Sequence, residues 1–230
     1  MGGMSIQPHN MQLALAQNMS SIEMQWNQTI PQQEKGRKFE EKYAQLQYMF
    51  VGGDIEKLSE VKADRAKESA RLKWIAYKDQ FFSTVLIADD AFESTQMEST
   101  PLNALSRYIK EYNTTTSLPL DITGKKTTDL HYYLGPNHYN TLKAYDTDVE
   151  KADRLHLNEL VPLGWKIVSW INKALVIPMF NLFTSWGLHI GIVILLMTLV
   201  IKLIILPFVF ASYKKKKKMR VLKPQLDEIN

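Results

Sequence analysis

The amino-acid sequence predicts a mixed fold, in which an antiparallel β-sandwich precedes an amphipathic helix in the membrane interface and a membrane-spanning α-helix. Three observations support this prediction. In residues 1–150, short runs of alternating apolar and polar residues are separated by turn-forming residues. Residues 186–210 carry one full charge, and about 20 apolar residues are enough to cross a bilayer. Five consecutive lysines follow this segment, at 214–218.

The β-sandwich is predicted from alternation with a period of two, which places every second side chain on one face of a strand. Turn-like breaks recur every 10–20 residues, as is typical of a sandwich of short antiparallel strands. Gly52 and Gly53 suit a tight turn after one of these strands. Residues 71–88 predict two strands or one long bent strand, and a short helix is expected within 54–67. The other predicted strands lie at 11–16, 22–26, 46–50, 106–112, 117–122 and 129–135.

The polar stretch 146–158 predicts a linker, after which the amphipathic helix begins. Trp165 and Trp170 accompany lysines in this segment, and both residue types favour the membrane interface. A core helix of a soluble protein would show the same spacing, so this alternative stays open. Pro178 is expected to end or kink the helix. Apolar residues recur at helical spacing at Leu163, Ile167, Trp170, Ile171 and Ala174.

The membrane-spanning helix has Trp186 near one end and Tyr213 near the other, which suits the aromatic belts of a bilayer. Basic residues accumulate on the cytoplasmic side of membrane helices, so the lysine run predicts a cytoplasmic C-terminal end and an external β-domain. The predicted divisions are a periplasmic β-domain at 1–150, a linker and interfacial helix at 151–183, a membrane helix at 184–212, and the start of a cytoplasmic arm at 213–230.

One charged residue, Lys202, lies within the apolar segment, where a charge costs about 2.5–3.5 kcal/mol. Gly191, Thr198 and Lys202 are spaced at i, i+7 and i+11, so they share one face of a helix. This stripe favours a surface lined by protein or water. The alternative is a lysine whose long side chain reaches the interface. Gly187 and Gly191 form a GxxxG pattern, which indicates a close-packing seam or only a loop and a helix start.

The basic end of the apolar segment has three interpretations. It is a topological signal, a binding surface for anionic lipids, or a contact for ribosomal RNA. Apolar residues at heptad-like spacing in 219–229 predict that the helix continues as a cytoplasmic arm. The basic patch consists of Lys214, Lys215, Lys216, Lys217, Lys218, Arg220 and Lys223.

The composition argues against several classes of protein. There is no cysteine, which excludes disulfides, thiol nucleophiles and thiolate metal sites. The five histidines are scattered without metal-ligand spacing, and no P-loop or nucleophile-elbow motif occurs. We therefore expect no enzyme, no metal and no cofactor. The net charge of +4 comes from the basic patch, so general affinity for nucleic acid is not implied.

Six stretches carry a resemblance to a known family and keep its order over nearly the whole chain. The chain resembles the YidC/Oxa/Alb membrane protein insertases, in the form found in Bacteroidetes. The five-lysine run departs from the pattern of the family, which has small residues there. The matching stretches are "IPQQEKGRKFE", "LKWIAYKDQFF", "YYLGPNHYNTLKAYD", "LVPLGW", "WGLHIGIVILLMTLVIKLIILPF" and "KMRVLKPQLDEIN".

The resemblance implies a periplasmic β-supersandwich, an interfacial helix, and five core membrane helices with a cytoplasmic hairpin. It implies a hydrophilic groove in which Lys202 is the basic residue, with Thr198 and Pro207 as its neighbours. The implied function is to assist insertion and folding of inner-membrane proteins, alone or with the Sec translocon. The implied partners are nascent membrane proteins, the Sec translocon, the ribosome and anionic lipids. We interpret the chain as a fragment that lacks the N-terminal anchor, the first part of the periplasmic domain and four core helices, because it has no signal peptide in front of an external domain.

A second hypothesis is a membrane-anchored periplasmic β-domain with a binding or carbohydrate-related role, since the supersandwich resembles sugar-mutarotase folds. A carboxylate–histidine pair in a cleft would favour this hypothesis. A groove-facing charge and a cytoplasmic arm would favour the insertase.

Overall fold

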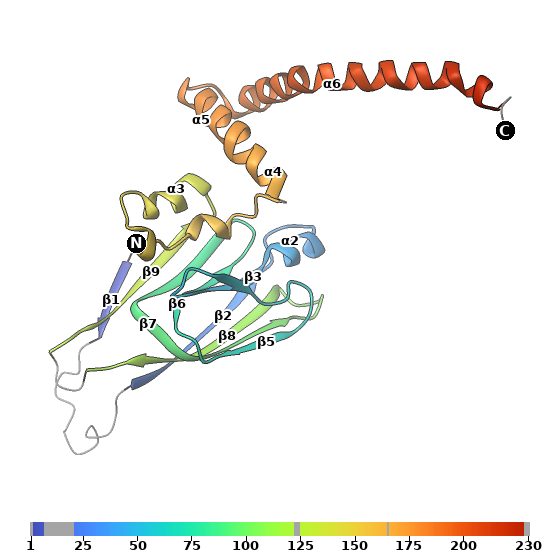
Figure 1. Ribbon diagram of the computed structural model, residues 1–230. Helices are drawn as coiled ribbons and strands as arrows, with labels where there is room; N and C mark the ends of the chain where they lie inside the picture. The colour runs from blue at the N-terminus through green and yellow to red at the C-terminus, as the bar shows by residue number, and fades with distance from the viewer. Residues whose placement is uncertain (1, 7–20, 122–124, 165, 228–230) are drawn as a thin grey trace. The chain divides into compact units, whose positions relative to one another are not determined.

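The computed structural model describes residues 2–6, 21–121, 125–164 and 166–227, and describes side chains within 21–121, 125–164 and 168–216. The chain divides into two compact units, with unit 1 ending at Val161 and unit 2 beginning at Pro162 (Figure 1). In its described residues unit 1 consists of β-strands with the short α-helices α2 (Arg37–Tyr43) and α3 (Tyr139–Lys143), whereas the described part of unit 2 is helical. The predicted antiparallel β-domain followed by an apolar helix is therefore confirmed.

The described strands of unit 1 form two antiparallel layers. The first layer has the order β1-β9-β7-β6-β3-β4, and the second has the order β2-β8-β7-β5. The strand predicted at 11–16 lies outside the described residues. The strands are β1 (Gly2–Ile6), β2 (Ser21–Pro31), β3 (Gln45–Phe50), β4 (Ile55–Lys57), β5 (Asp64–Glu68), β6 (Leu72–Lys78), β7 (Phe82–Pro101), β8 (Tyr108–Pro119) and β9 (Thr128–Pro136).

Strand β7 belongs to both layers and joins them. Its first half pairs with β6 and β9, and its second half pairs with β5 and β8. The change of layer occurs where the register shifts between Glu93 and Gln96. Ser94, inside this irregularity, has a φ of 47°, in the left-handed region that a non-glycine residue seldom adopts. An irregularity of this kind bends a strand, so β7 folds the sheet over itself.

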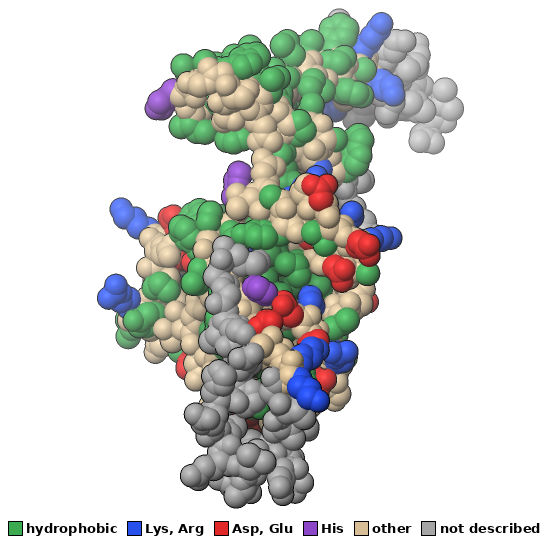
Figure 2. Space-filling view, turned by 90° about the vertical axis from the view of Figure 1, so that its left-hand side faces the viewer, with side chains coloured by type: hydrophobic (Ala, Val, Ile, Leu, Met, Phe, Trp, Pro, Cys, Tyr) green, Lys and Arg blue, Asp and Glu red, His purple; other side chains and the backbone are tan. Residues whose placement is uncertain are grey.

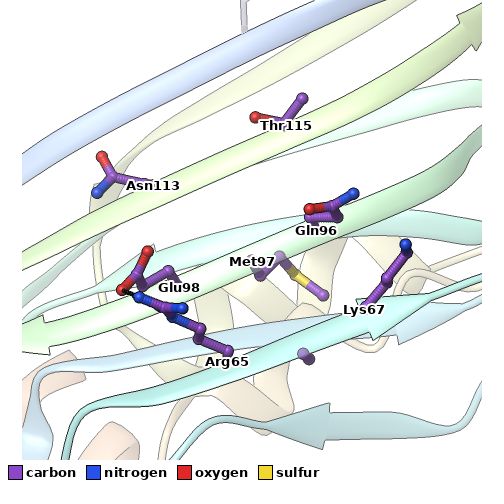
Figure 3. A pocket seen from close by; sticks show the side chains of 8 residues that line it. Arg65, Lys67, Gln96, Met97, Glu98, Asn113 and Thr115 are labelled. Carbon is purple, nitrogen blue, oxygen red and sulfur yellow. Dashed lines mark hydrogen bonds and ion pairs between the residues drawn. The ribbon is translucent and has the colours of Figure 1, made fainter.

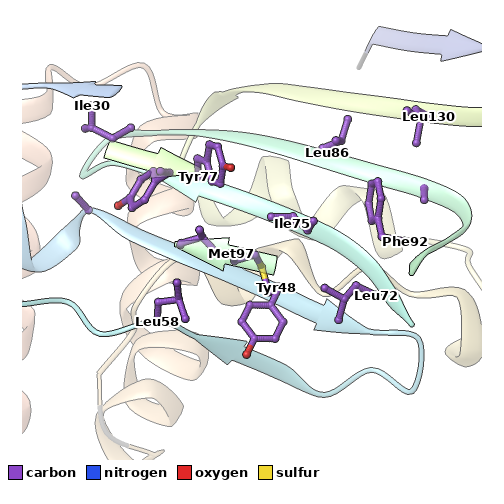
Figure 4. Close-up of a cluster of buried hydrophobic side chains, with 14 of the residues drawn as sticks. Ile30, Tyr48, Leu58, Leu72, Ile75, Tyr77, Leu86, Phe92, Met97 and Leu130 are labelled. Carbon is purple, nitrogen blue, oxygen red and sulfur yellow. The ribbon is translucent and has the colours of Figure 1, made fainter. Parts of the chain in front are cut away.

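The main core lies between the two layers (Figure 4). In β2, burial alternates along the strand, as the period of two predicts. In β6, by contrast, nearly every residue is buried, because the first layer is covered on both faces. Ile75 and Tyr77 face the main core, and Trp74 and Ala76 face a second cluster on the other side. The segment 71–88 thus forms two strands, the first of its two predicted arrangements.

The second cluster is covered by residues 139–161. These form α3 (Tyr139–Lys143) and three 3₁₀ turns, and they bury Leu142, Leu157 and Leu160 against the first layer. The Trp74 indole N–H donates to the Leu155 carbonyl at 2.7 Å. The prediction of a polar linker at 146–158 is therefore wrong. The leucines within this stretch pack in or against the second cluster. Its polar side chains accept hydrogen bonds from backbone N–H groups of the turns.

The helix expected within 54–67 is also wrong, because β4 and β5 occupy this region. Each strand pairs with an edge of one layer, and this pairing overrides the weak helix preference of its lysines and glutamates. A helix that the sequence analysis did not predict, α2 (Arg37–Tyr43), precedes β3 instead.

Helix α2 is held by side chains at both ends. The buried Glu40 carboxylate accepts backbone N–H bonds from Gln33 at 2.9 Å and Glu34 at 3.1 Å. Arg37 donates to the carbonyls of the β7–β8 connection, at distances of 2.8–3.0 Å. A short helix is marginal alone, so these bonds and its packing keep it in place.

Two buried lysines meet the C-terminal end of α2. Lys78 Nζ donates to the Tyr43 carbonyl at 3.0 Å, and Lys110 Nζ donates to the Ala44 and Glu60 carbonyls at 2.5 and 2.6 Å. Cations are favoured at this end of a helix dipole. Removal from water nevertheless dominates, and it lowers the pKa of Lys78 and of Lys110 to about 8 each.

We predict that unit 1 becomes more stable as the pH rises from 8 to about 10. In this window the unfolded chain keeps protons on both lysines, whereas the folded protein releases them, so the free energy of unfolding rises. The expected rise is roughly 2–4 kcal/mol for the pair. Above about pH 10 the trend reverses, because burial raises the pKa of Tyr77 and Tyr112 above the value for an unfolded chain.

The measurement is urea unfolding in mild detergent at several pH values, followed by tryptophan fluorescence. The matched control replaces both lysines by methionine, which keeps the apolar stems. A slope between pH 8 and 10 that is equal in the control would contradict the assignment.

Candidate functional site

The helices of unit 2 follow one another closely. They are α4 (Lys166–Ile171), a π-helical turn (Asn172–Val176), α5 (Ile177–Ser185) and α6 (Ile190–Asp227). The sequence predicts that Pro178 ends or kinks the helix. The helix does not end there, because α5 continues to Ser185, but a π-helical turn interrupts its regular geometry just before the proline. Proline lacks an N–H and clashes with the carbonyl four residues earlier. The wider π turn directly before Pro178 is the backbone adjustment that accompanies it.

The apolar helix begins later than predicted. Trp186 follows the end of α5, and Gly187 has a φ of 70°, which only glycine adopts freely. Helix α6 then starts at Ile190, and the His189 ring Nδ1 accepts the Gly191 N–H at 3.3 Å. Gly187 is therefore a turn residue, which removes the GxxxG seam and leaves the loop interpretation. The helix expected to begin at 184 starts six residues further on.

Two faces of α6 have different surroundings. Val193 is fully buried, and α5 packs against this part of α6. At 100° per residue, Lys202 lies about 180° around the axis from Val193. Gly191 and Thr198 are within about 40° of Lys202, and all three are exposed. The predicted stripe is thus a continuous helical face, on the side away from α5.

Within this stripe the hydroxyl and the charge differ in their bonding. Thr198 Oγ1 donates to the Ile194 carbonyl at 2.8 Å, so the helix itself satisfies this hydroxyl. A threonine bonded in this way tolerates an apolar environment. Lys202 is exposed on the helix surface. The hydroxyl is therefore bonded within the helix, whereas the charged group lies on the exposed surface of the stripe.

The length and composition of α6 suit a membrane. The candidate span Ile190–Lys216 is 27 residues long, and its most apolar 18-residue window has a mean hydropathy of 2.9 and is only 6% buried. Figure 2 shows hydrophobic side chains covering the helices of unit 2, with basic side chains at one end. Over unit 1, acidic and basic side chains are interspersed. Length, apolarity and exposure together fit a lipid-facing helix and not the core helix of a soluble domain.

The predicted interfacial residues are only partly described. Trp170 on α4 is 70% exposed, and Trp186 is 61% exposed beside Phe183, with ring centroids 5.5 Å apart. Trp165 lies outside the described residues. Indoles of this exposure present a large apolar surface with a polar N–H, which suits the headgroup region.

The basic patch begins on the same helix. Lys214, Lys215 and Lys216 are exposed. The backbone is helical through Asp227, so the lysines surround the axis, as consecutive residues in a helix do. The side chains of Lys217, Lys218, Arg220 and Lys223 lie outside the described part of the chain.

Unit 1 carries a shallow, polar groove on the outer face of the second layer (Figure 3). Its side chains follow two cross-strand rows: Asn113, Glu98 and Arg65 form one, and Thr115, Gln96 and Lys67 form the other. Arg65 and Glu98 are joined by an ion pair at 2.8 Å. The groove is wide open to solvent and has no histidine in its lining.

The carboxylate–histidine pair that would favour the carbohydrate hypothesis is not found in this groove. Asp89 and His131 form a pair at 3.0 Å, but both side chains are about half exposed and lie elsewhere on the surface. Among the described residues, no group of three His, Asp or Glu side chains is placed to hold a metal ion. The structure therefore gives no specific support to a catalytic role for unit 1.

These features define a class of protein: an antiparallel β-domain connected through a short amphipathic helix to a membrane helix. Residues 4–178 match the family model described as the YidC periplasmic domain. The chain is 46% identical over 216 residues to a membrane protein insertase YidC of Parabacteroides distasonis, covering 94% of this chain and 34% of the relative.

Two further relatives carry the same name. The one from Azobacteroides pseudotrichonymphae is 47% identical over 96% of this chain and 36% of the relative, and the one from Bacteroides fragilis is 44% identical over 94% and 35%. The chain belongs to the YidC family of membrane protein insertases. It spans about a third of the length of the curated relatives that it matches.

Sequence reasoning considered Gly187 as part of a loop and a helix start, but it did not identify His189 and Asn172 as residues that shape the helix ends. His189 and Gly187 define the start of α6, and the Asn172 side chain donates to the Leu163 carbonyl at 3.1 Å. A glycine and a polar residue directly before an apolar run are a helix-start signal. That signal was present in "WGLHIG".

We predict that Trp170 and Trp186 lie at headgroup depth, about 15 Å from the bilayer centre. In reconstituted vesicles, lipids brominated near the headgroup are expected to quench these indoles most strongly. The measurement compares the protein with the variants Trp170→Phe and Trp186→Phe, because each difference isolates one indole from the others. A difference spectrum without any depth dependence would contradict the prediction.

Proposed function

We propose that this chain is part of an insertase that assists the insertion and folding of integral membrane proteins, and that Lys202 supplies a positive charge to its hydrophilic groove. The observation that carries the proposal is the position of Lys202: an exposed charge on the helix stripe that faces away from α5. Family membership and the names of the relatives support the general activity.

The depth of Lys202 argues against an anchoring role. At 1.5 Å per residue, Lys202 lies about 18 Å along the helix from Ile190 and about 18 Å from Lys214. It is therefore near the middle of the candidate span, about 15 Å from either edge of the hydrocarbon layer. A four-carbon stem does not reach across that distance. A lysine at this depth requires water or a polar partner beside it.

A wet groove explains both the charge and its effect on substrates. Two unit charges 4 Å apart attract by about 1 kcal/mol in bulk water and by about 4 kcal/mol at a dielectric constant of 20. Lys202 therefore favours an acidic or polar substrate segment in the groove, without holding it permanently. Apolar segments of the substrate then pass into lipid, and this transfer drives insertion without a nucleotide. The other groove helices would come from the parts of the longer relatives that this chain does not span.

The proposed topology follows from the lysines of α6. Because basic residues accumulate on the cytoplasmic side of membrane helices, these lysines favour a cytoplasmic basic end and a periplasmic unit 1. The same end is proposed to contact anionic lipids and the ribosome, and the complete protein to act alone or with the Sec translocon. The proposed location is the inner membrane.

We predict that Lys202→Arg retains insertion and that Lys202→Ala slows it for substrates with acidic translocated segments. The expected loss is about 1–2 kcal/mol, or roughly 5- to 30-fold in rate, because a wet groove screens charge. Lys202→Glu is expected to be worse, since attraction becomes repulsion. The measurement is insertion of paired acidic and neutral substrates into vesicles that contain the full-length protein.

The matched control exchanges two neighbours: Lys202→Leu combined with Leu203→Lys. This variant keeps composition, depth and snorkelling ability, but it turns the charge by about 100° around the helix. If the groove charge matters, the exchange variant is expected to insert acidic substrates as slowly as Lys202→Ala does. Rescue of acidic substrates by the exchange, or an equal loss for neutral substrates, would refute the proposal.

We predict a periplasmic Leu105 and a cytoplasmic Lys216. The chain has no cysteine, so Leu105→Cys and Lys216→Cys give single labelling sites at exposed positions. An impermeant maleimide added to intact spheroplasts is expected to label only the first variant, and lysis is expected to expose the second. Labelling of Lys216→Cys before lysis would reverse the topology.

A further inference from the structure

The turn between β6 and β7 presents apolar side chains to solvent. Phe81 is 43% exposed and Phe82 is 51% exposed. Leu134, on the neighbouring strand β9, is 72% exposed. The pairings of Phe82 with Pro136 and of Thr84 with Leu134 put Phe82 and Leu134 on the same face of the sheet. We call Phe81, Phe82 and Leu134 the apolar tip.

Several hydrogen bonds from side chains hold the backbone of this tip in place. The Asp79 carboxylate accepts the N–H of Phe81 at 2.7 Å and that of Phe82. The Asn137 side-chain amide donates to the carbonyls of Asp79 and Phe82 at 3.1 and 3.2 Å. The Ser83 hydroxyl donates to the Asn137 side-chain oxygen. The two exposed phenylalanines thus sit on a rigid turn.

The end of β9 is braced in the same way. The Tyr133 hydroxyl donates to the Pro136 carbonyl at 2.7 Å. Its ring lies so close to Gly135 that a Cβ there would be 2.8 Å from the hydroxyl oxygen. Only glycine permits this approach. Both strands that carry the apolar tip are therefore fixed in position.

The apolar tip is connected by direct packing to the place where the chain leaves unit 1. Asn137, which holds the turn, is followed by α3 at the end of β9 (Figure 1). Helix α3 contacts the 3₁₀ turn Leu157–Leu160, and Leu160 shares the second cluster with Val85 and Tyr133. Val85 is three residues from Phe82, or about 10 Å along the strand.

Val161 is the last residue of unit 1, and a short stretch connects it to helix α4. Helix α4 begins at Lys166, so the connection is at most about 17 Å long. If α4 lies in the membrane interface, the exit from unit 1 is held near the bilayer surface. The apolar tip is then within reach of the headgroups.

From this we propose that the apolar tip is a second membrane contact, which inserts Phe81, Phe82 and Leu134 into the outer bilayer interface and orients unit 1 on the membrane. The occupant is lipid. Aromatic side chains prefer the headgroup boundary, and the tip presents no free charge there, because Asp79 is buried and bonded within the turn. The inference depends on the interfacial position of α4, not on the groove charge of Lys202.

Spin labelling in proteoliposomes tests the proposal cleanly, because the chain contains no cysteine. Phe81→Cys and Leu134→Cys place a nitroxide at two exposed positions of the tip without altering a backbone hydrogen bond. We expect collisions with oxygen to exceed those with a water-soluble nickel chelate several-fold at both positions. The control, Lys125→Cys, is exposed and lies beyond the opposite end of β9, which is nine residues long. There we expect the reverse ratio.

Two results would overturn the proposal. A tip label that collides freely with the nickel chelate would show that the tip faces water. A label that is immobile and shielded from both reagents would show that protein covers the tip. Brominated-lipid quenching of Trp170 in the same vesicles separates these outcomes from a failure of α4 to bind the interface.

Discussion

The passage of β7 from one layer to the other is the constraint on which unit 1 depends. A single 20-residue strand pairs with four neighbours, so the two layers cannot separate without breaking its ladders. The left-handed backbone at Ser94 sets where the strand bends. The part of β7 before the bend belongs to the layer that carries the apolar tip and the exit of the chain, and the part after the bend belongs to the layer that carries the polar groove. Because of the bend, the two halves of β7 contribute to different surfaces of unit 1.

The first layer anchors the segment of unit 1 that leads into the helices of unit 2. It is buried on both faces, and residues 139–161 are packed onto it by Trp74, Leu157 and Leu160. Were the stretch 146–158 a free linker, its 13 residues would span up to about 40–50 Å when extended. Packing shortens the tether to the few residues before α4.

Much of the fold followed from local patterns in the sequence. Alternation predicted β2, β3, β6 and β9, and apolarity predicted the membrane helix. The failures share one physical cause, which is that distant partners decided the outcome. Helix α2 is held by Arg37, Glu40 and two lysines that are far away in sequence. The apparent linker became a packed cover because Trp74, more than 80 residues earlier, bonds to its backbone.

For the candidate site, helical spacing was enough to place Gly191, Thr198 and Lys202 on one stripe, but not to say which side α5 covers. The turn at Gly187 connects α5 to α6, and it has no periodic signature in the sequence. The starting point of α6 also changes the energetics of Lys202. A helix that began at 184 would bring the lysine toward the basic interface, where a long side chain escapes the hydrocarbon. Starting at Ile190 and ending its apolar run before Lys214, the same helix puts the lysine near the centre, where only water or a polar partner makes the charge tolerable. A six-residue shift at the start of the helix thus moves Lys202 toward the middle of the apolar run, and this position is one reason for proposing a hydrophilic groove beside it.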